Sequence, residues 1–172
     1  FEALKKAIEE NKAGRLDEVK DEVEFALHRE ADTHILVDMI AEGKLPLRVT
    51  HNDTKLNNIL FDNISNKGIC IIDLDTVMPG SALYDFGDAL RIGASTAAED
   101  ETNLDLVTFD EEIFNSFAKG YFEEMGEKLT EREKELLPFS AKLLTFECGV
   151  RFLTDYLNGD TYFKIHREHH NL

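Results

Sequence analysis

The chain has 172 residues, of which 42% are hydrophobic and 31% are charged, enough to bury one ordinary core. Its 19 basic and 35 acidic residues give a formal net charge of −16 at pH 7. This excess repels nucleic-acid phosphates and anionic membranes, so partners of both kinds are disfavoured. No apolar run is long enough to span a membrane, and the first residues do not resemble a signal peptide. We therefore expect a cytoplasmic protein, with Cys70 and Cys148 as buried free thiols.

Residues 1–43 carry apolar side chains at a spacing of three to four, which is typical of helices. The stretch 13–15 contains a glycine and divides this part into two predicted helices. Gly43 and Pro46 then end the second of them.

The next part of the chain changes to short apolar segments rich in β-branched residues. Three of them occupy residues 47–50, 58–61 and 69–72. The last two flank residues 62–68, where Asp, Asn, Ser and Gly provide turn chemistry. This pattern predicts a β-hairpin.

Helical spacing returns after Gly80. We expect a short helix over residues 85–91, ended by Gly93, and then a polar loop over residues 94–106.

Two capping boxes, Thr108–Glu111 and Thr130–Glu133, precede two further predicted helices. Pro138 is placed to interrupt the second, so that residues 139–157 form a separate apolar helix ending at Gly159. The sequence therefore predicts an α+β fold, mostly helical around one small β element.

Polar residues of the predicted hairpin point to a metal. If strands 58–62 and 69–73 pair antiparallel, Asn58 lies opposite Asp73. Directly opposed residues have Cβ atoms about 5 Å apart. An amide oxygen and a carboxylate at that distance are suitable ligands for Mg²⁺.

The loop before the hairpin adds Asp53 and Lys55 to the same place. Phosphoryl transfer uses this set: a metal that bridges phosphates, a cation near developing negative charge, and a carboxylate that orients the acceptor hydroxyl. The alternative is that Asp53, Asn58 and Asp73 are ordinary turn and strand-end residues. No Walker loop or Gly-x-Gly-x-x-Gly motif is present, which excludes P-loop and Rossmann enzymes.

These residues resemble a known family. The pattern His51-x-Asp53-x₄-Asn58, followed by Asp73 at a strand end and by Tyr84-Asp85-Phe86, is similar to the aminoglycoside phosphotransferase and choline kinase-like group, which has the protein-kinase fold. The resemblance covers essentially the whole chain, is most specific over residues 49–92, and is closest to the N-acetylhexosamine 1-kinase branch. It implies transfer of the ATP γ-phosphate to the anomeric hydroxyl of N-acetylglucosamine or N-acetylgalactosamine.

The resemblance also implies roles for individual residues. Asp53 would orient the acceptor hydroxyl as a catalytic residue, and Asn58 and Asp73 would hold Mg²⁺. Lys55 would contact the transferred phosphate, with a solvated lysine as the alternative. His51 would fix the catalytic loop.

A further acidic residue, Asp85, would brace this loop from outside it. Asp75 is either a supplementary metal or substrate group or a loop acid. Asp88 is a further candidate for substrate binding, and the sequence does not decide its role.

The predicted sugar site is carried by the C-terminal part of the chain. Arg151 interrupts an apolar helical run, and Tyr162 follows the Gly159 break, where a loop can fold back over a pocket. The alternative for Arg151 is a surface ion-pair stripe with residues one turn away. Asn52 is a further candidate for substrate binding.

Nothing before His51 resembles the small nucleotide-binding lobe that kinases of this fold possess. We therefore expect residues 1–172 to be the large, C-terminal lobe, inactive on its own, with part of the ATP site on the missing N-terminal lobe. Two alternatives remain. One is a kinase of the same fold for another small alcohol, such as choline, homoserine or an aminoglycoside, and the other is a non-catalytic binding module. The sequence does not determine the epimer, the anomer or the oligomeric state.

Overall fold

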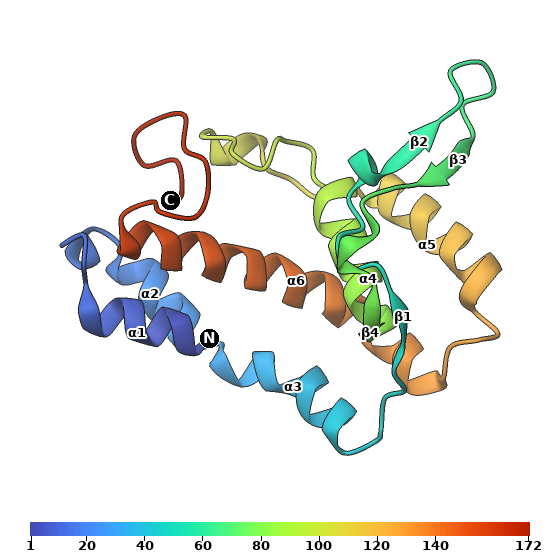
Figure 1. The fold of residues 1–172 in the computed structure, drawn as a ribbon, viewed down its shortest axis with the longest axis horizontal. Coiled ribbons are helices and arrows are strands. Elements are labelled where there is room, and N and C mark those ends of the chain that lie inside the picture. Colours follow the sequence, from blue (N-terminus) through green and yellow to red (C-terminus); the bar gives the residue numbers. More distant parts are fainter. The chain divides into compact units, whose positions relative to one another are not determined.

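The computed structural model describes residues 1–172 and has the α+β composition expected from the sequence (Figure 1). The chain divides into two compact units, residues 1–38 with 146–172 and residues 39–145, which are described separately. None of its helices combines the length and the apolar character needed to cross a membrane.

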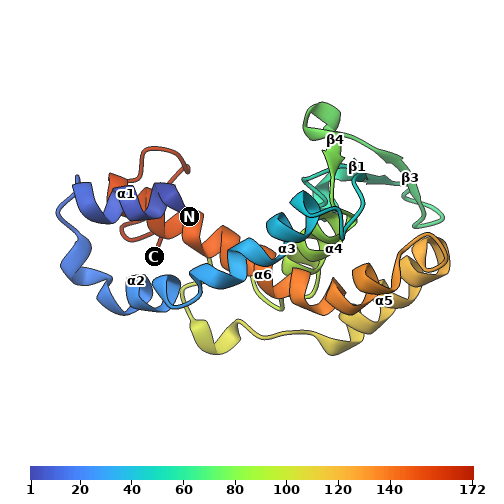
Figure 2. The ribbon, with the colours of Figure 1, turned by 90° about the horizontal axis from the view of Figure 1, so that it is seen from below.

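The first unit is helical. Its elements are α1 (Glu2–Glu10), α2 (Lys20–Leu27), most of α3 (Glu30–Ala41) and the end of α6 (Glu131–Asn158). Buried side chains from α1, α2 and α6 form its core, with Leu4, Val19, Tyr156 and Leu157 fully buried. These helices lie side by side in both ribbon views (Figures 1 and 2).

The N-terminal region differs from the two predicted helices. It contains three helices and a 3₁₀ turn, Leu16–Glu18, because the chain breaks again at Arg29 between α2 and α3. The first break lies where it was predicted, since Asn11 and Gly14 both adopt positive φ. The second carries no Gly or Pro signal, so the apolar spacing alone could not place it.

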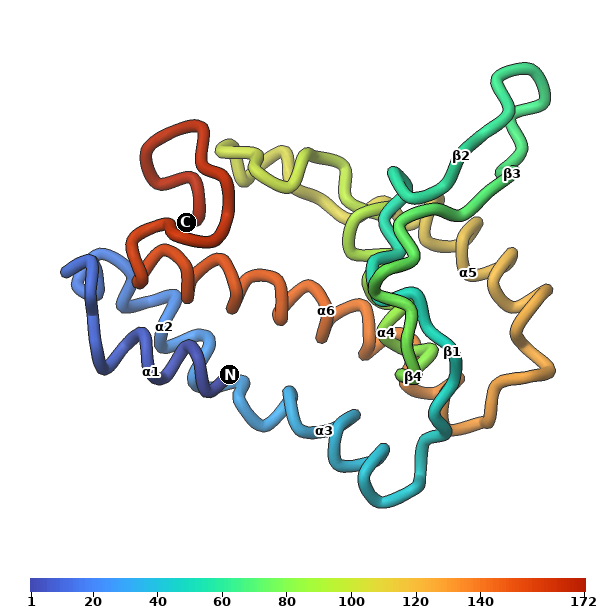
Figure 3. Tube along the Cα trace, viewed as in Figure 1, coloured from blue at the N-terminus to red at the C-terminus, as the bar shows by residue number.

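The second unit contains the β-strands and α4 (Ala82–Gly93), α5 (Glu111–Met125) and the first part of α6. Strand β1 (Arg48–Thr50) pairs antiparallel with β4 (Met78–Gly80). Strand β2 (Ile59–Phe61) pairs antiparallel with β3 (Gly68–Ile71), which confirms the predicted hairpin. The trace runs through β1, this hairpin and β4 before it enters α4 (Figure 3).

Helix α4 is central to the second unit. It begins at its N-cap Ser81, whose side chain accepts a hydrogen bond from the Leu83 amide, and buries Phe86 against the rings of Phe117 and Tyr121. Gly87 allows a close approach to α6, since a Cβ there would lie 2.5 Å from the Ser140 carbonyl oxygen. The helix starts three residues earlier than predicted.

Two predicted helix starts have different outcomes. The box at Thr130 forms as expected, because the Glu133 carboxylate accepts the Thr130 amide at 2.8 Å and the Glu133 amide donates to the Thr130 hydroxyl. The predicted capping box at Thr108 does not form. Asp110 caps α5, accepting the amides of residues 112 and 113, while Thr108 pairs with Thr96.

Pro138 does not divide α6, contrary to the prediction. The proline removes one backbone donor, but Leu137 and Ser140 beside it are buried, and their packing offsets that local loss. The predicted stop at Gly159 is confirmed, with a φ of +91°.

The expected burial of the cysteines was also wrong. Neither cysteine forms a disulfide bond, but Cys70 is exposed and Cys148 is only partly buried. Cys70 lies on β3, where all four residues are exposed. Its apolar neighbours therefore do not indicate a covered surface in this part of the chain.

Candidate active site

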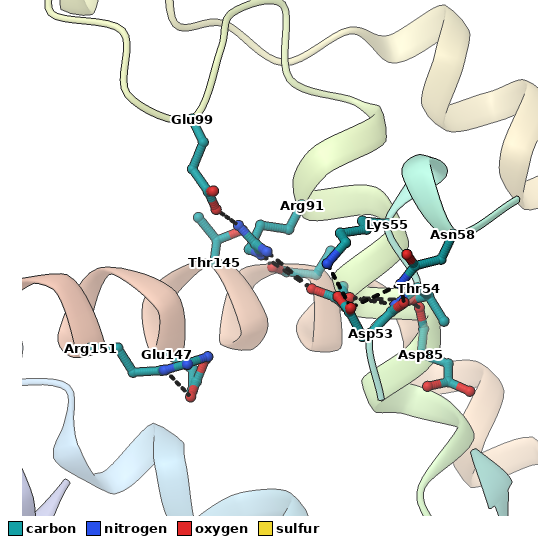
Figure 4. A network of polar contacts seen from close by, with 12 residues as sticks. Asp53, Thr54, Lys55, Asn58, Asp85, Arg91, Glu99, Thr145, Glu147 and Arg151 are labelled. Atoms are coloured by element: carbon teal, nitrogen blue, oxygen red, sulfur yellow. Dashed lines mark hydrogen bonds and ion pairs between the residues drawn. The ribbon is translucent and has the colours of Figure 1, made fainter. Parts of the chain in front are cut away.

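The loop between β1 and the 3₁₀ turn Leu56–Asn58 gathers three of the predicted site residues (Figure 4). The Asp53 Oδ2 atom accepts hydrogen bonds from Lys55 Nζ at 2.7 Å and from Asn58 Nδ2 at 2.8 Å. Asn58 Nδ2 also donates to the Asp53 backbone carbonyl at 2.9 Å. The structure therefore brings Asp53, Lys55 and Asn58 into direct contact.

The surroundings of Asp53 keep its carboxylate ionised. Partial burial is the largest single influence and opposes ionisation. The hydrogen bonds from Lys55 and Asn58, with the positive charge of Lys55, together outweigh it and lower the pKa of Asp53 below its ordinary value of 3.8. A carboxylate of this kind is a weak base and a good hydrogen-bond acceptor, which suits it to orienting a hydroxyl group.

Lys55 is held in its charged form by the same neighbours. The hydrogen bond to Asp53 is the largest influence that raises the pKa of Lys55 above 10.5. Burial opposes the rise, and the charges of Asp53, Asp73 and Asp88 add to it. Asp73 therefore lies within electrostatic range of Lys55, although it comes from the other side of the hairpin.

The predicted strand register was wrong by one residue. Ile59 pairs with Ile71, and the Ile72 amide donates to the Asn58 carbonyl at 2.9 Å, so Asn58 lies opposite Ile72 rather than Asp73. Asp73 follows directly, with a left-handed φ of 63° at the start of the turn Leu74–Thr76. Because Asn58 also belongs to a 3₁₀ turn, neither side chain follows the alternation of a strand.

The donor atoms of Asn58 and Asp73 are compatible with Mg²⁺. Both hydrogens of the Asn58 amide point at Asp53, which leaves its Oδ1 atom as an acceptor without a hydrogen bond. The exposed Asp73 carboxylate makes no hydrogen bond or ion pair. Mg²⁺ in phosphoryl-transfer sites takes one or two such protein oxygens and completes its shell with phosphates and water.

Asp85 contacts the loop after β1 from α4. Its two carboxylate oxygens each accept one backbone amide at 2.8 Å, one from His51 and one from Asn52. His51 Nε2 donates to the Ile72 carbonyl at 3.0 Å, immediately before Asp73. His51 therefore connects the loop to the strand end that carries Asp73, which agrees with a structural role.

Asn52 is used within the protein. Its Nδ2 atom donates to the Thr76 carbonyl at 3.0 Å, and its Oδ1 atom accepts from the Thr50 hydroxyl at 3.0 Å. Its backbone has a left-handed φ of 63°, which asparagine tolerates better than most residues. These contacts favour a loop-fixing role over the predicted contact with substrate.

No single role was predicted from the sequence for three residues near the site, Thr76, Asp88 and Asp75. Thr76 donates to the His51 carbonyl at 2.6 Å, and Asp88 accepts the Thr54 amide at 2.8 Å. Their only sequence signal is position, Thr76 just after the predicted metal ligand and Asp88 one helical turn after Asp85. Asp75 is exposed in a turn and makes no polar contact.

Arg151 and Tyr162 contact each other in the first unit. Arg151 Nη2 donates to the Tyr162 hydroxyl at 3.5 Å, and the guanidinium lies 5.8 Å and 5.5 Å from the ring centroids of Tyr162 and Phe163. Arg151 Nε also lies 3.8 Å from a Glu147 carboxylate oxygen, so the predicted ion-pair alternative is present as well (Figure 4).

These side chains line a pocket of about 370 Å³ between α1, the end of α6 and the loop after Gly159. Buried Asp155 shapes its wall, because its carboxylate accepts the backbone amides of residues 161, 162 and 163 at 2.8–2.9 Å. The volume lies within the range of about 300–1,000 Å³ for small-molecule sites.

Comparison with known families identifies the class of protein. The family model APH, described as "Phosphotransferase enzyme family", matches residues 1–124. The chain belongs to this family. The match confirms the expected aminoglycoside phosphotransferase and choline kinase-like grouping. It includes the whole catalytic loop, the hairpin and α4, and it stops before Arg151 and Tyr162.

Proposed function

We propose that this phosphotransferase transfers the γ-phosphate of ATP, with Mg²⁺, to the anomeric hydroxyl of an N-acetylhexosamine. The contact set of Asp53, Lys55 and Asn58, with Asp73 in electrostatic range, is the observation that carries the transfer chemistry. The choice of acceptor rests on the resemblance in the sequence and on the pocket beside Arg151.

Each residue of the catalytic loop has one task in this proposal. The Asp53 carboxylate accepts a hydrogen bond from the acceptor hydroxyl and aims its oxygen at the γ-phosphate. Lys55 places its ammonium group where negative charge develops on the transferred phosphoryl group. Asn58 and Asp73 would hold Mg²⁺, which would supply positive charge to the phosphates of ATP.

The acceptor-binding residues proposed from the sequence belong to the first unit. Tyr162 and Phe163 offer aromatic surface for a sugar ring, and Arg151 and Glu147 offer a charged donor and acceptor for its hydroxyls. Together with buried Asp155, which fixes the loop backbone, they form a site of suitable size and chemistry for a small neutral sugar.

We also propose that residues 1–172 are the large lobe of a two-lobed enzyme, whose second lobe completes the ATP site. The hairpin supports this, because isolated two-stranded sheets are marginally stable and its apolar side chains are open to solvent. Ile69 is 65% exposed and Ile71 is 59% exposed. Turnover by the isolated 172-residue chain equal to that of a longer natural form would contradict this part of the proposal.

The acceptor is tested by ADP release from the full-length protein with ATP and Mg²⁺. The panel contains N-acetylglucosamine, N-acetylgalactosamine, glucose, choline, homoserine and kanamycin. Turnover confined to the N-acetylhexosamines, with ³¹P NMR locating the phosphate on the anomeric oxygen, is the expected result. Turnover on another acceptor would keep the phosphotransferase chemistry and reject the proposed substrate. Binding of Mg–nucleotide without turnover on any acceptor would favour the non-catalytic alternative.

A further inference from the structure

We propose that Asp88 is a positioning residue for the catalytic loop, which holds the backbone directly after Asp53. This role rests on the proposed function of that loop. It assigns a task to a residue whose part in the site the sequence leaves open.

The contacts of Asp88 point in two directions. Its Oδ2 atom accepts the Thr54 amide at 2.8 Å and lies 3.3 Å from the Thr54 hydroxyl. Its Oδ1 atom accepts hydrogen bonds from Arg91 Nε at 3.3 Å and Arg91 Nη2 at 3.2 Å. The side chain is 14% exposed, so water competes little for these contacts.

Asp88 complements Asp85, which lies one helical turn earlier on the same face of α4. Asp85 accepts the two amides that precede Asp53, and Asp88 accepts the one that follows it. The Thr54 hydroxyl adds a hydrogen bond of 2.7 Å to the Asp85 carbonyl. The backbone of Asp53 is therefore fixed on both sides by carboxylates from one rigid helix.

Only a carboxylate meets both demands at position 88. Both of its oxygens are acceptors, and both face donors, the Thr54 amide on one side and the Arg91 guanidinium on the other. An asparagine would turn its NH₂ group toward one of these donors. In Asp88→Asn either the Thr54 amide or Arg91 therefore loses its hydrogen bond to position 88.

The arginine beyond Asp88 allows a rescue experiment. In Asp88→Asn combined with Arg91→Met, the donors that compete for the asparagine oxygen are gone, so this oxygen can turn to the Thr54 amide. The double variant should therefore regain turnover relative to Asp88→Asn. If Asp88 only paired with Arg91 for stability, adding the second substitution would bring no gain.

The test combines turnover with amide hydrogen exchange at single residues, measured on the full-length protein. For Asp88→Asn we expect kcat to fall about 10- to 100-fold, the Kd for Mg–nucleotide to stay within about twofold, and the Thr54 amide to exchange faster. The amides of His51 and Asn52, held by Asp85, should keep their protection. Asp105→Asn removes the same charge from an exposed side chain without polar contacts and serves as the control.

Three outcomes would overturn the role of Asp88: unchanged exchange at Thr54, faster exchange with unchanged kcat, or a double variant no more active than Asp88→Asn. If the wild-type protein turns over no acceptor, the proposed function fails instead. The exchange at Thr54 then still decides whether Asp88 holds this backbone. Thermal unfolding of each variant separates these results from loss of the fold.

Discussion

Lys55 donates a 2.7 Å hydrogen bond to the carboxylate of Asp53, two residues before it in the same loop. This contact keeps the lysine cationic and the aspartate ionised, since the pKa of Lys55 is raised and that of Asp53 is lowered. Both groups are therefore in the charge state that phosphoryl transfer requires.

Replacing Lys55 by methionine tests this pair. We expect kcat to fall about 10²- to 10³-fold, because the cation near the transferred phosphoryl group is lost. The pKa of Asp53 should rise, since burial remains while the lysine hydrogen bond and charge are removed. The acid limb of the kcat profile should then move to higher pH. An unaltered profile with wild-type kcat would mean that Lys55 is an ordinary solvated lysine.

The metal assignment predicts a specific defect in Asp73→Asn. One carboxylate ligand is lost, so the Mg²⁺ concentration for half-maximal activity should rise about 10- to 100-fold. Titration of ADP release with Mg²⁺ at saturating ATP measures this. Asp105→Asn, with the same loss of charge, should leave the titration unchanged. A wild-type Mg²⁺ requirement in Asp73→Asn would contradict the assignment.

The ion pair between partly exposed Arg48 and buried Glu133 predicts a pH-dependent stability. Glu133 is fully buried and accepts Arg48 Nε and Nη2 at 2.7 Å each. Burial opposes its ionisation, but the Arg48 and Thr130 hydrogen bonds outweigh this and lower the pKa of Glu133 below 4.5. A carboxyl with a lower pKa in the folded state stabilises the protein above its unfolded pKa. This contribution is lost as the pH falls through the folded pKa.

Glu133→Gln should therefore destabilise the protein by about 3 kcal/mol at pH 7, because Arg48 loses its charged partner in a buried site. Denaturant unfolding at several pH values measures the effect, which should shrink toward low pH. The control on the same helix is Glu135→Gln. Glu135 and its partner Arg132 are both exposed, so losing this ion pair should change the stability little. Equal effects of the two substitutions would contradict the expectation.

Gly87→Ala should disturb the packing of α4 and, through it, the active site. An alanine Cβ would lie 2.5 Å from the Ser140 carbonyl oxygen, so α4 and α6 would have to separate. We expect a loss of about 1–3 kcal/mol in stability, together with reduced turnover, because α4 carries Asp85 and Asp88. A Cβ at Gly120 of α5 would meet no atom within 4 Å, and Gly120→Ala should stabilise by up to about 1 kcal/mol. Thermal unfolding that ranks the two variants the other way would be inconsistent with the tight contact.

The chemistry of the loop was easier to predict than its geometry. The spacing of Asp53 and Asn58 predicted their meeting because both lie in one short segment, and their contact follows from local turns. Placing Asp73 needed the strand register, and this was wrong by one residue because Asn58 leaves the strand for a 3₁₀ turn. Two-residue periodicity cannot indicate where a strand gives way to such a turn.

Contacts between residues far apart in the chain were largely not predicted from the sequence. Thr130 and Glu133 form their capping box because they lie three positions apart in the chain. Thr108 instead forms a hydrogen bond with Thr96 across a loop. The continuity of α6 through Pro138 depends on buried neighbours in the same way. Local signals therefore predicted elements, while competing tertiary contacts decided their ends.

The role of Asp53 in orienting the acceptor is tested most directly by the turnover of Asp53→Asn. The variant keeps the size of the side chain but loses its charge, and with it the strong hydrogen bond to an acceptor hydroxyl. With the acceptor identified by the panel, we predict that kcat falls by about 10² to 10⁴ while the Kd for Mg–nucleotide stays within about twofold. A variant that keeps more than about half of the wild-type kcat would contradict the role of Asp53 and with it the proposed mechanism.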